Sequence, residues 1–145
     1  MEIVKNLHSY WAYLVLLILV ITAVNSLIKV SGGKEYGAKD FRLALFTLIV
    51  THIQLLIALI LYVTSPLLSA FGELGMGGVM KNSAIRLLLI EHPLINIIAI
   101  ALITIGYSKH KKKLTSASKF KMIAIFYTIA LLLFLSRIPW TNWFN

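Results

Sequence analysis

Two histidines lie far inside hydrophobic segments that are long enough to cross a bilayer. His52 belongs to the segment FTLIVTHIQLLIALILY, and His92 belongs to IRLLLIEHPLINIIAIALITI. An ionisable side chain at such depth costs about 3 kcal/mol or more on insertion scales, so it needs a partner and marks a functional site by default. Imidazoles in such a setting can bind a metal or a haem iron, or transfer protons. We therefore expect the chemistry of this chain to centre on these two residues.

The elements that must position these histidines are membrane-spanning helices. The chain has 145 residues, of which 59% are hydrophobic, and its mean hydropathy is +0.88; soluble domains are nearer half apolar. Four apolar segments, at residues 10–28, 43–63, 85–107 and 122–138, each approach the ~20 residues that span ~30 Å of hydrocarbon. The sequence thus predicts an all-α membrane protein with a single domain, residues 1–145, in which four transmembrane helices form an up-down-up-down bundle. The first segment is expected to stay in the mature protein, because no small-residue cleavage site follows it.

The chain contains no cysteine. This excludes disulfides, thiol redox chemistry, iron–sulfur ligation and the covalent attachment of haem through cysteine. Any cofactor must therefore be held by histidine, by carboxylate or by packing.

The net charge of +9 is concentrated at two of the connections between helices. Lysines and arginines gather around the first and third connections, as Lys29, Lys34, Lys39, Arg42, Lys109, Lys111, Lys112, Lys113, Lys119 and Lys121. By the positive-inside rule these connections are cytoplasmic, and both termini and the second connection face outward. The KHKKK run can also contact anionic lipid headgroups. Nucleic-acid binding is disfavoured because the run has no interleaved aromatic residues. We expect His110, within this run, to be exposed to solvent.

Small and polar residues recur at helical spacing on each of the first three segments. The expected inward faces are His8, Trp11, Val15, Thr22, Asn25 and Ser26 on the first, Thr47, Thr51, Gln54, Ala58 and Tyr62 on the second, and His92, Asn96, Ala99, Ile103 and Gly106 on the third. His52 lies at the edge of the second face. Such faces are usual where membrane helices pack, so they indicate a bundle and no particular cofactor.

The depths of the two histidines favour a shared ligand. His52 lies about 12 residues, or roughly 18 Å, below Thr64, and His92 lies about 9 residues, or roughly 13 Å, below Ser83. At similar depth on adjacent helices, they could be the two axial ligands of one b-type haem between helices two and three. Alternatively each imidazole is neutral and hydrogen-bonded, for example His92 to Thr51 or Gln54, or the two form a metal or substrate site.

Two arginines near the outward helix ends, and a carboxylate deep in the third helix beside His92, fit a haem site. Arg86 and Arg137 could pair with haem propionates, or could extend to the lipid headgroups. Glu91 could balance the charge of Arg137, orient a histidine or pass protons to a quinol. Pro93 leaves the Leu89 carbonyl without its usual donor and should kink the third helix.

His8 lies nearer the membrane surface than the other two histidines. It is flanked by Tyr10, Trp11 and Tyr13, so we expect it to anchor the first helix at the interface. It could ligate a second haem only if another ligand lay at its height, and the sequence suggests none.

The segments HSYWAY, THIQLLIALILY, IEHPLINIIAIALITIGYSKHKK and SRIPW together resemble a family of small four-helix bacterial inner-membrane proteins described as cytochrome b-like. The resemblance covers nearly the whole chain, and its most specific parts are T-H-I-Q, E-H-P and I-G-Y-S-K. A more distant likeness is to half of a haem A synthase, in which helix histidines hold b-type haem; this likeness implies His52 and His92 as ligands. The chain is shorter than those enzymes and has only two deep histidines, which argues against a haem-modifying activity.

These features lead to one main expectation and two alternatives. The main one is a b-type cytochrome in the bacterial inner membrane that binds one haem and transfers single electrons, with a quinol as a candidate donor. It would act as an electron carrier or as a haem-dependent oxidoreductase. A first alternative is a non-catalytic subunit that packs against a larger respiratory or transport complex. A second is a carrier of protons or small molecules centred on Glu91 and His92; the chain lacks the repeats usual for alternating access.

Overall fold

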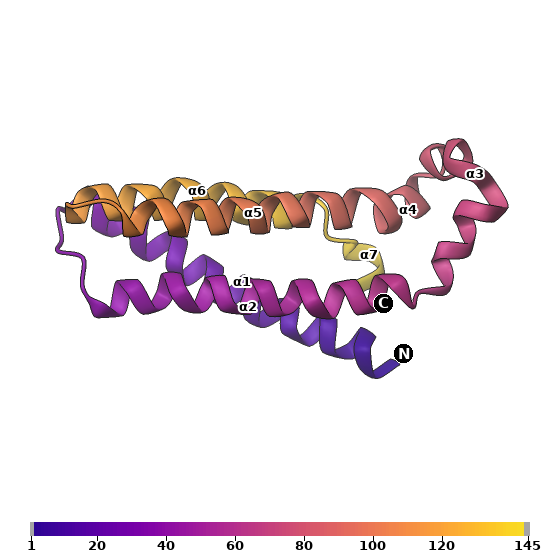
Figure 1. Ribbon diagram of the computed structural model, residues 1–145, viewed down its shortest axis with the longest axis horizontal. Coiled ribbons are helices and arrows are strands. Elements are labelled where there is room, and N and C mark those ends of the chain that lie inside the picture. Colours follow the sequence, from indigo (N-terminus) through magenta and orange to yellow (C-terminus); the bar gives the residue numbers. More distant parts are fainter. Residues whose placement is uncertain (1, 144–145) are drawn as a thin grey trace.

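The computed structural model describes residues 2–143, and the regular secondary structure within them is entirely helical (Figure 1). The elements are α1 (Glu2–Gly32), α2 (Ala38–Val63), the short 3₁₀-helix η1 (Pro66–Leu68), α3 (Ser69–Lys81), α4 (Ser83–Arg86), the π-helical turn η2 (Leu87–Glu91), α5 (His92–Lys111), α6 (Ser116–Ser136) and α7 (Trp140–Trp143). The segments α4, η2 and α5 form one continuous span, residues 83–111.

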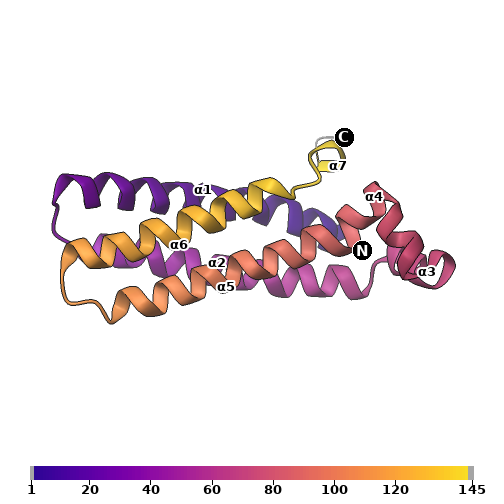
Figure 2. The ribbon, with the colours of Figure 1, turned by 90° about the horizontal axis from the view of Figure 1, so that it is seen from above.

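Four of these helices are long and apolar enough to cross a membrane, which confirms the expected all-α four-helix bundle. Successive spans run antiparallel, because short connections at residues 33–37 and 112–115 join α1 to α2 and α5 to α6. Figures 1 and 2 show both of these connections at one end of the bundle and the two chain ends toward the other. We call these the lysine-rich end and the terminal end.

Helices α1 and α2 are joined by polar contacts along their length. The Trp11 indole Nε1 donates to the Val50 carbonyl at 2.8 Å, and the Thr22 and Thr47 hydroxyls lie 2.9 Å apart with both side chains buried. Polar groups between membrane helices find no competing water, so these contacts fix the register of the pair. The inward orientation expected for the threonine face of the second segment is confirmed, since Thr47 and Thr51 are fully buried.

A carboxylate is buried where α2 begins. Asp40 accepts hydrogen bonds from the backbone N–H of Gly37 at 2.9 Å and from the Asn25 amide at 2.9 Å. It also forms an ion pair with Lys29, with Nζ and Oδ1 2.8 Å apart. A carboxylate near a helix N-terminus is favoured by the helix dipole, and these donors compensate for its burial. Asp40 thereby ties the end of α1 to the start of α2.

His110 was expected to be exposed among the lysines, and that expectation was wrong. Its side chain is fully buried, because the connection after α1 folds back over α5 and places the Tyr36 hydroxyl 2.8 Å from Nε2. The other ring nitrogen, Nδ1, donates to the Tyr107 carbonyl. Burial raises the pKa of the Tyr36 phenol above its usual range. The lysine-rich end is thus closed by a packed aromatic cluster.

The glycine-rich second connection is folded rather than a flexible loop. It forms η1 and α3, and α3 bends at Gly75, whose φ of +70° is a conformation that suits glycine. Val79 is fully buried and packs in one cluster with Ala70 and Leu89. Figure 1 shows α3 beyond the ends of α2 and α4, so the connection covers the terminal end of that half of the bundle.

Helices α5 and α6 approach each other closely at Gly106. A Cβ atom built on this residue would lie 2.4 Å from Cβ of Phe126. Glycine is therefore required for the close contact that holds these two helices together.

Candidate functional site

The site is built on an irregular turn in the third span. Pro93 has no N–H to give to the carbonyl of Leu89, and the helix there widens into the π-turn η2, in which the His92 N–H reaches back to the Leu87 carbonyl. The freed Leu89 carbonyl accepts a hydrogen bond from the Tyr62 hydroxyl at 2.9 Å. Where a kink was expected at Pro93, the structure has this π-turn within a continuous span, and Tyr62 of α2 supplies the donor that Leu89 lacks. Single π-turns are frequent at functional sites.

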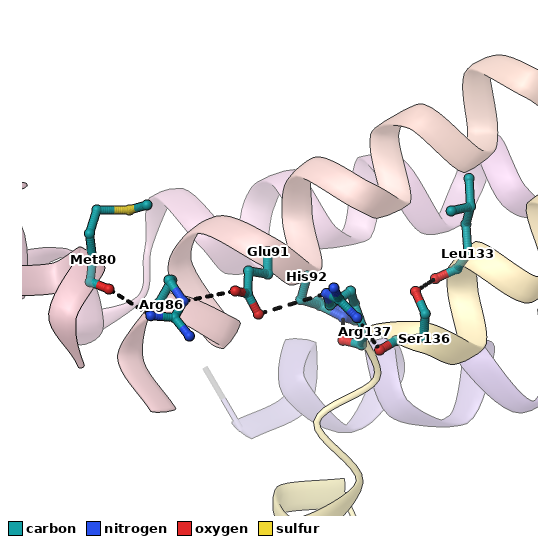
Figure 3. A network of polar contacts seen from close by, with 7 residues as sticks. All are labelled: Met80, Arg86, Glu91, His92, Leu133, Ser136 and Arg137. Atoms are coloured by element: carbon teal, nitrogen blue, oxygen red, sulfur yellow. Dashed lines mark hydrogen bonds and ion pairs between the residues drawn. The ribbon is translucent and has the colours of Figure 1, made fainter. Parts of the chain in front are cut away.

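Glu91 lies between two arginines, as Figure 3 shows. Its Oε2 atom is 2.8 Å from Nε of Arg86, and its Oε1 atom is 3.7 Å from Nε of Arg137. Arg86 also donates to the Met80 carbonyl at 2.7 Å, which links α3 to the same network. Of the roles considered for Glu91, charge balance with Arg137 is the one seen in this arrangement.

His92 points toward the end of α6. Its Nδ1 atom lies 2.9 Å from the backbone carbonyl of Arg137, which can only accept, so Nδ1 must donate and Nε2 keeps its lone pair. The Asn96 amide nitrogen lies 3.2 Å from Nε2. An imidazole whose Nδ1–H is held by a backbone carbonyl is oriented as a metal-ligating histidine usually is.

The partner of His92 is His8 from α1. The two ring centroids are 6.2 Å apart, and the ring planes are nearly perpendicular, at 88°. The Gln54 side chain holds the backbone of α1 at this level by donating to the His8 carbonyl at 2.9 Å. His8 is therefore more than a surface anchor, because it meets His92 inside the terminal end of the bundle. The sequence contained a signal for this, since His8 shares the inward face of α1 with Trp11.

Three polar atoms near this pair are buried without a hydrogen-bond partner among residues 2–143. They are Nδ1 of His8, Oε1 of Gln54 and Oδ1 of Asn96, and Thr128 Oγ1 is the other such atom in this range. An unsatisfied buried polar atom costs about 1–3 kcal/mol. These atoms gather around His8 and His92, so this region has hydrogen-bonding capacity for a further polar group.

His52 does not lie in this site, so the structure does not bring together the pair expected from the sequence. Its side chain is exposed on the outside of α2, with Nε2 3.3 Å from the Thr104 hydroxyl. Thr104 follows His92 by 12 residues in α5, which corresponds to roughly 18 Å along the helix axis. Two axial ligands of one iron have their nitrogens only ~4 Å apart. In this arrangement His52 and His92 therefore cannot bind the same iron.

The centroid separation of His8 and His92 is similar to that of two imidazoles bound to one iron. Imidazoles bound on opposite sides of one iron, at ~2 Å from it, have centroids roughly 6 Å apart, close to the 6.2 Å observed. Within residues 2–143 no group of three or more histidine and acidic side chains is placed to hold a metal ion. A bare metal ion usually needs three or four protein ligands, whereas a haem brings four nitrogens and needs only one or two. The residues present therefore fit a haem better than a bare ion.

The two arginines are also placed near the pair. Arg137 supplies the carbonyl that holds His92, and its guanidinium reaches Glu91, which in turn reaches Arg86. A guanidinium has five N–H donors, and the contacts made here use only part of that capacity. Both side chains could thus bind propionate groups while keeping Glu91 as a shared partner.

Comparison with protein-family models, with curated proteins and with solved structures found no match to this chain. The resemblance to cytochrome b-like membrane proteins therefore stays a prediction.

Proposed function

We propose that this protein is a membrane b-type cytochrome whose single haem is bound by His8 of α1 and His92 of α5. The observation that supports this most is the 6.2 Å separation of the two imidazoles inside a four-helix bundle. Haem sites in such bundles are formed by side chains on facing helices. The proposal keeps the expected cofactor and replaces His52 by His8 as the second ligand.

The chain's own residues would orient and tune this site. The Arg137 carbonyl fixes the tautomer of His92 by accepting from Nδ1, and this hydrogen bond makes Nε2 a stronger ligand. Binding at Nε2 requires Asn96 to release its 3.2 Å contact with that atom. When bound, the haem would supply one-electron redox chemistry. Arg86 and Arg137 would provide positive charge for the propionates.

A titration of purified, haem-free protein in detergent with hemin tests this proposal. We expect saturation at one haem per chain, with the spectrum of a six-coordinate, low-spin haem. Either His8→Ala or His92→Ala should abolish that spectrum, because each removes one axial ligand. Arg137→Gln keeps the backbone carbonyl and should weaken haem binding only by roughly tenfold, as expected for an outer contact.

Asn96→Ala is the matched control for this titration, since Asn96 contacts His92 and is not a proposed ligand. It should keep the six-coordinate spectrum. Binding that does not saturate, or that is equal in the wild type and in both histidine variants, would show that hemin only partitions into the micelle. The proposal would then be rejected.

A further inference from the structure

A pocket at the lysine-rich end lies on the outside of the bundle, where the last part of α1 meets the first turns of α2. It has a volume of about 470 Å³, and its lining includes Lys29, Lys39, Asp40, Arg42, Leu43 and Phe46. Its charged side chains are three cations and one carboxylate, so the net charge of the lining is +2. The ligand that this pocket attracts is therefore an anion.

The charges in this pocket are not equally available to a ligand. Asp40 already accepts hydrogen bonds from three donors, and one of these is its ion-pair partner Lys29. Lys39 and Arg42 are exposed, and their charged groups form no hydrogen bond or ion pair within residues 2–143. These two cations are one turn apart on the same face of α2, so one phosphate can bind both. The ammonium of a zwitterionic headgroup would instead meet a carboxylate that already has three donors.

The apolar part of the pocket continues along this face of α2. Leu43 follows Lys39, and Phe46 follows Arg42, each at a spacing of four residues. Phe46 is 48% exposed. It lies seven residues beyond Lys39, or roughly 10 Å along the helix axis. The order of charge and apolar surface thus matches a molecule whose phosphate adjoins a hydrocarbon tail.

The length of α2 places the two cations at the level of lipid headgroups. The helix has 26 residues, which corresponds to roughly 39 Å, whereas the hydrocarbon core is ~30 Å thick. The ends of α2 must therefore extend into the headgroup layers when the helix spans the membrane. A lipid phosphate and its first methylene groups are then at the depths of the charged and apolar parts of the pocket.

We propose that this pocket is a selective site for one anionic phospholipid, whose phosphate binds Lys39 and Arg42 and whose acyl chain packs on Phe46. The proposal goes beyond a general attraction of anionic headgroups by the KHKKK run, because it places the selectivity at α2. It is also independent of the proposed haem site at the other end of the bundle.

The binding test uses the delipidated full-length protein in a neutral detergent and three probes, with bound ligand counted by native mass spectrometry. The probes are dioleoyl phosphatidylglycerol, dioleoyl phosphatidylcholine and glycerol phosphate. We expect one phosphatidylglycerol per chain, bound at least tenfold more tightly than either other probe. Equal affinity for the two lipids would overturn the proposal. Glycerol phosphate bound as tightly as phosphatidylglycerol would show a site for a soluble phosphate and would overturn the assignment to a lipid.

Substitutions at the same end of the bundle separate the pocket from general charge attraction. Each cation near a membrane surface strengthens binding of anionic lipid roughly fivefold, so Lys39→Gln with Arg42→Gln should remove the preference for phosphatidylglycerol. Lys112→Gln with Lys113→Gln is the matched control, because it removes two exposed charges outside the pocket and should keep the preference. Equal losses in the two double variants would overturn the proposal. Phe46→Ala should weaken phosphatidylglycerol binding and leave the affinity for glycerol phosphate unchanged; an unchanged lipid affinity would reject the acyl-chain contact.

Arginine resonances locate the bound lipid. The chain has three arginines, and Arg86 and Arg137 both belong to the Glu91 network at the terminal end. In protein labelled with ¹⁵N-arginine, phosphatidylglycerol should shift the Nε resonance of Arg42 and leave the other two in place. An unchanged Arg42 resonance on saturation with phosphatidylglycerol would reject this site.

Discussion

Replacing Gly106 by alanine tests how closely α5 and α6 pack. The added Cβ would lie 2.4 Å from Cβ of Phe126, 2.9 Å from its Cγ and 3.3 Å from its Cδ2. The nearest of these atoms is attached directly to the backbone of α6, so no rotamer change can move it away. The helices must separate by about 1 Å or more to reach the ~3.5–4.0 Å of a normal carbon contact.

The expected cost combines two opposing effects. Overpacking of this kind typically costs about 1–3 kcal/mol, and the better helix propensity of alanine returns up to about 1 kcal/mol. We therefore expect Gly106→Ala to lower the free energy of unfolding by about 1–2 kcal/mol. The assay is reversible unfolding in mixed dodecylmaltoside and dodecyl sulfate micelles, followed by circular dichroism.

Two variants make this measurement specific. Gly77→Ala is the control, because a Cβ there meets nothing within 4 Å, and it should not destabilise the protein. Phe126→Gly removes the clashing atom, so the double variant with Gly106→Ala should be more stable than the sum of the two single effects. A Gly106→Ala protein as stable as the wild type would refute the close packing of α5 on α6.

Three other predictions concern single contacts. Tyr62→Phe leaves the Leu89 carbonyl without its hydroxyl donor, and should lower the free energy of unfolding by about 1 kcal/mol in the same micelle assay; no change would mean that the π-turn needs no support from α2. Asp40→Ala removes the acceptor of Gly37, Asn25 and Lys29 and should lower the free energy of unfolding by about 1–3 kcal/mol. Lys29→Met should lower it less, because the Lys29 side chain is partly exposed. A larger effect of Lys29→Met would contradict the burial of Asp40. Tyr36 has a raised pKa in the folded protein, so its contribution to stability is complete below the unfolded value of about 10 and is lost as the pH rises above it. Tyr36→Phe should therefore reduce the loss of stability above pH ~10. In the wild type, the phenolate absorbance of all six tyrosines appearing with an ordinary tyrosine pKa would contradict the burial of the Tyr36 phenol.

The four spans could be predicted from composition, because length and apolar content alone define a membrane helix. The faces of α2 and α5 were also predictable, since Thr47, Ala99 and Gly106 follow helical spacing and are buried. These properties depend on one helix at a time.

The pairing of histidines depends on how two helices are aligned, and the sequence does not specify this. The depths of His52 and His92 were each counted from a different turn signal. In the structure His52 of α2 lies beside Thr104 of α5, far along the helix axis from His92. Counting residues along the chain also does not reveal the tilt of α1. Figure 1 shows that α1 crosses the bundle, and this tilt brings His8 toward His92. A shift of a few residues between antiparallel helices changes which side chains meet.

The burial of His110 was missed for a related reason. Its neighbours in sequence are lysines, which favoured an exposed site. Its packing partners are Tyr36 and Phe41, from the connection after α1 and the first turn of α2. Contacts between residues about 70 positions apart in the chain decide its environment.

The most direct test of the proposed ligand pair is the reduced-minus-oxidised absorption spectrum of protein purified from cells supplied with haem. The wild type and the His52→Ala, His8→Ala and His92→Ala variants would be compared at equal protein concentration. We expect the sharp visible bands of a six-coordinate b-type haem in the wild type and in His52→Ala, and their loss in His8→Ala and in His92→Ala. Loss of these bands in His52→Ala with retention in His8→Ala, or their absence from the wild type, would contradict the assignment of His8 and His92 as the haem ligands.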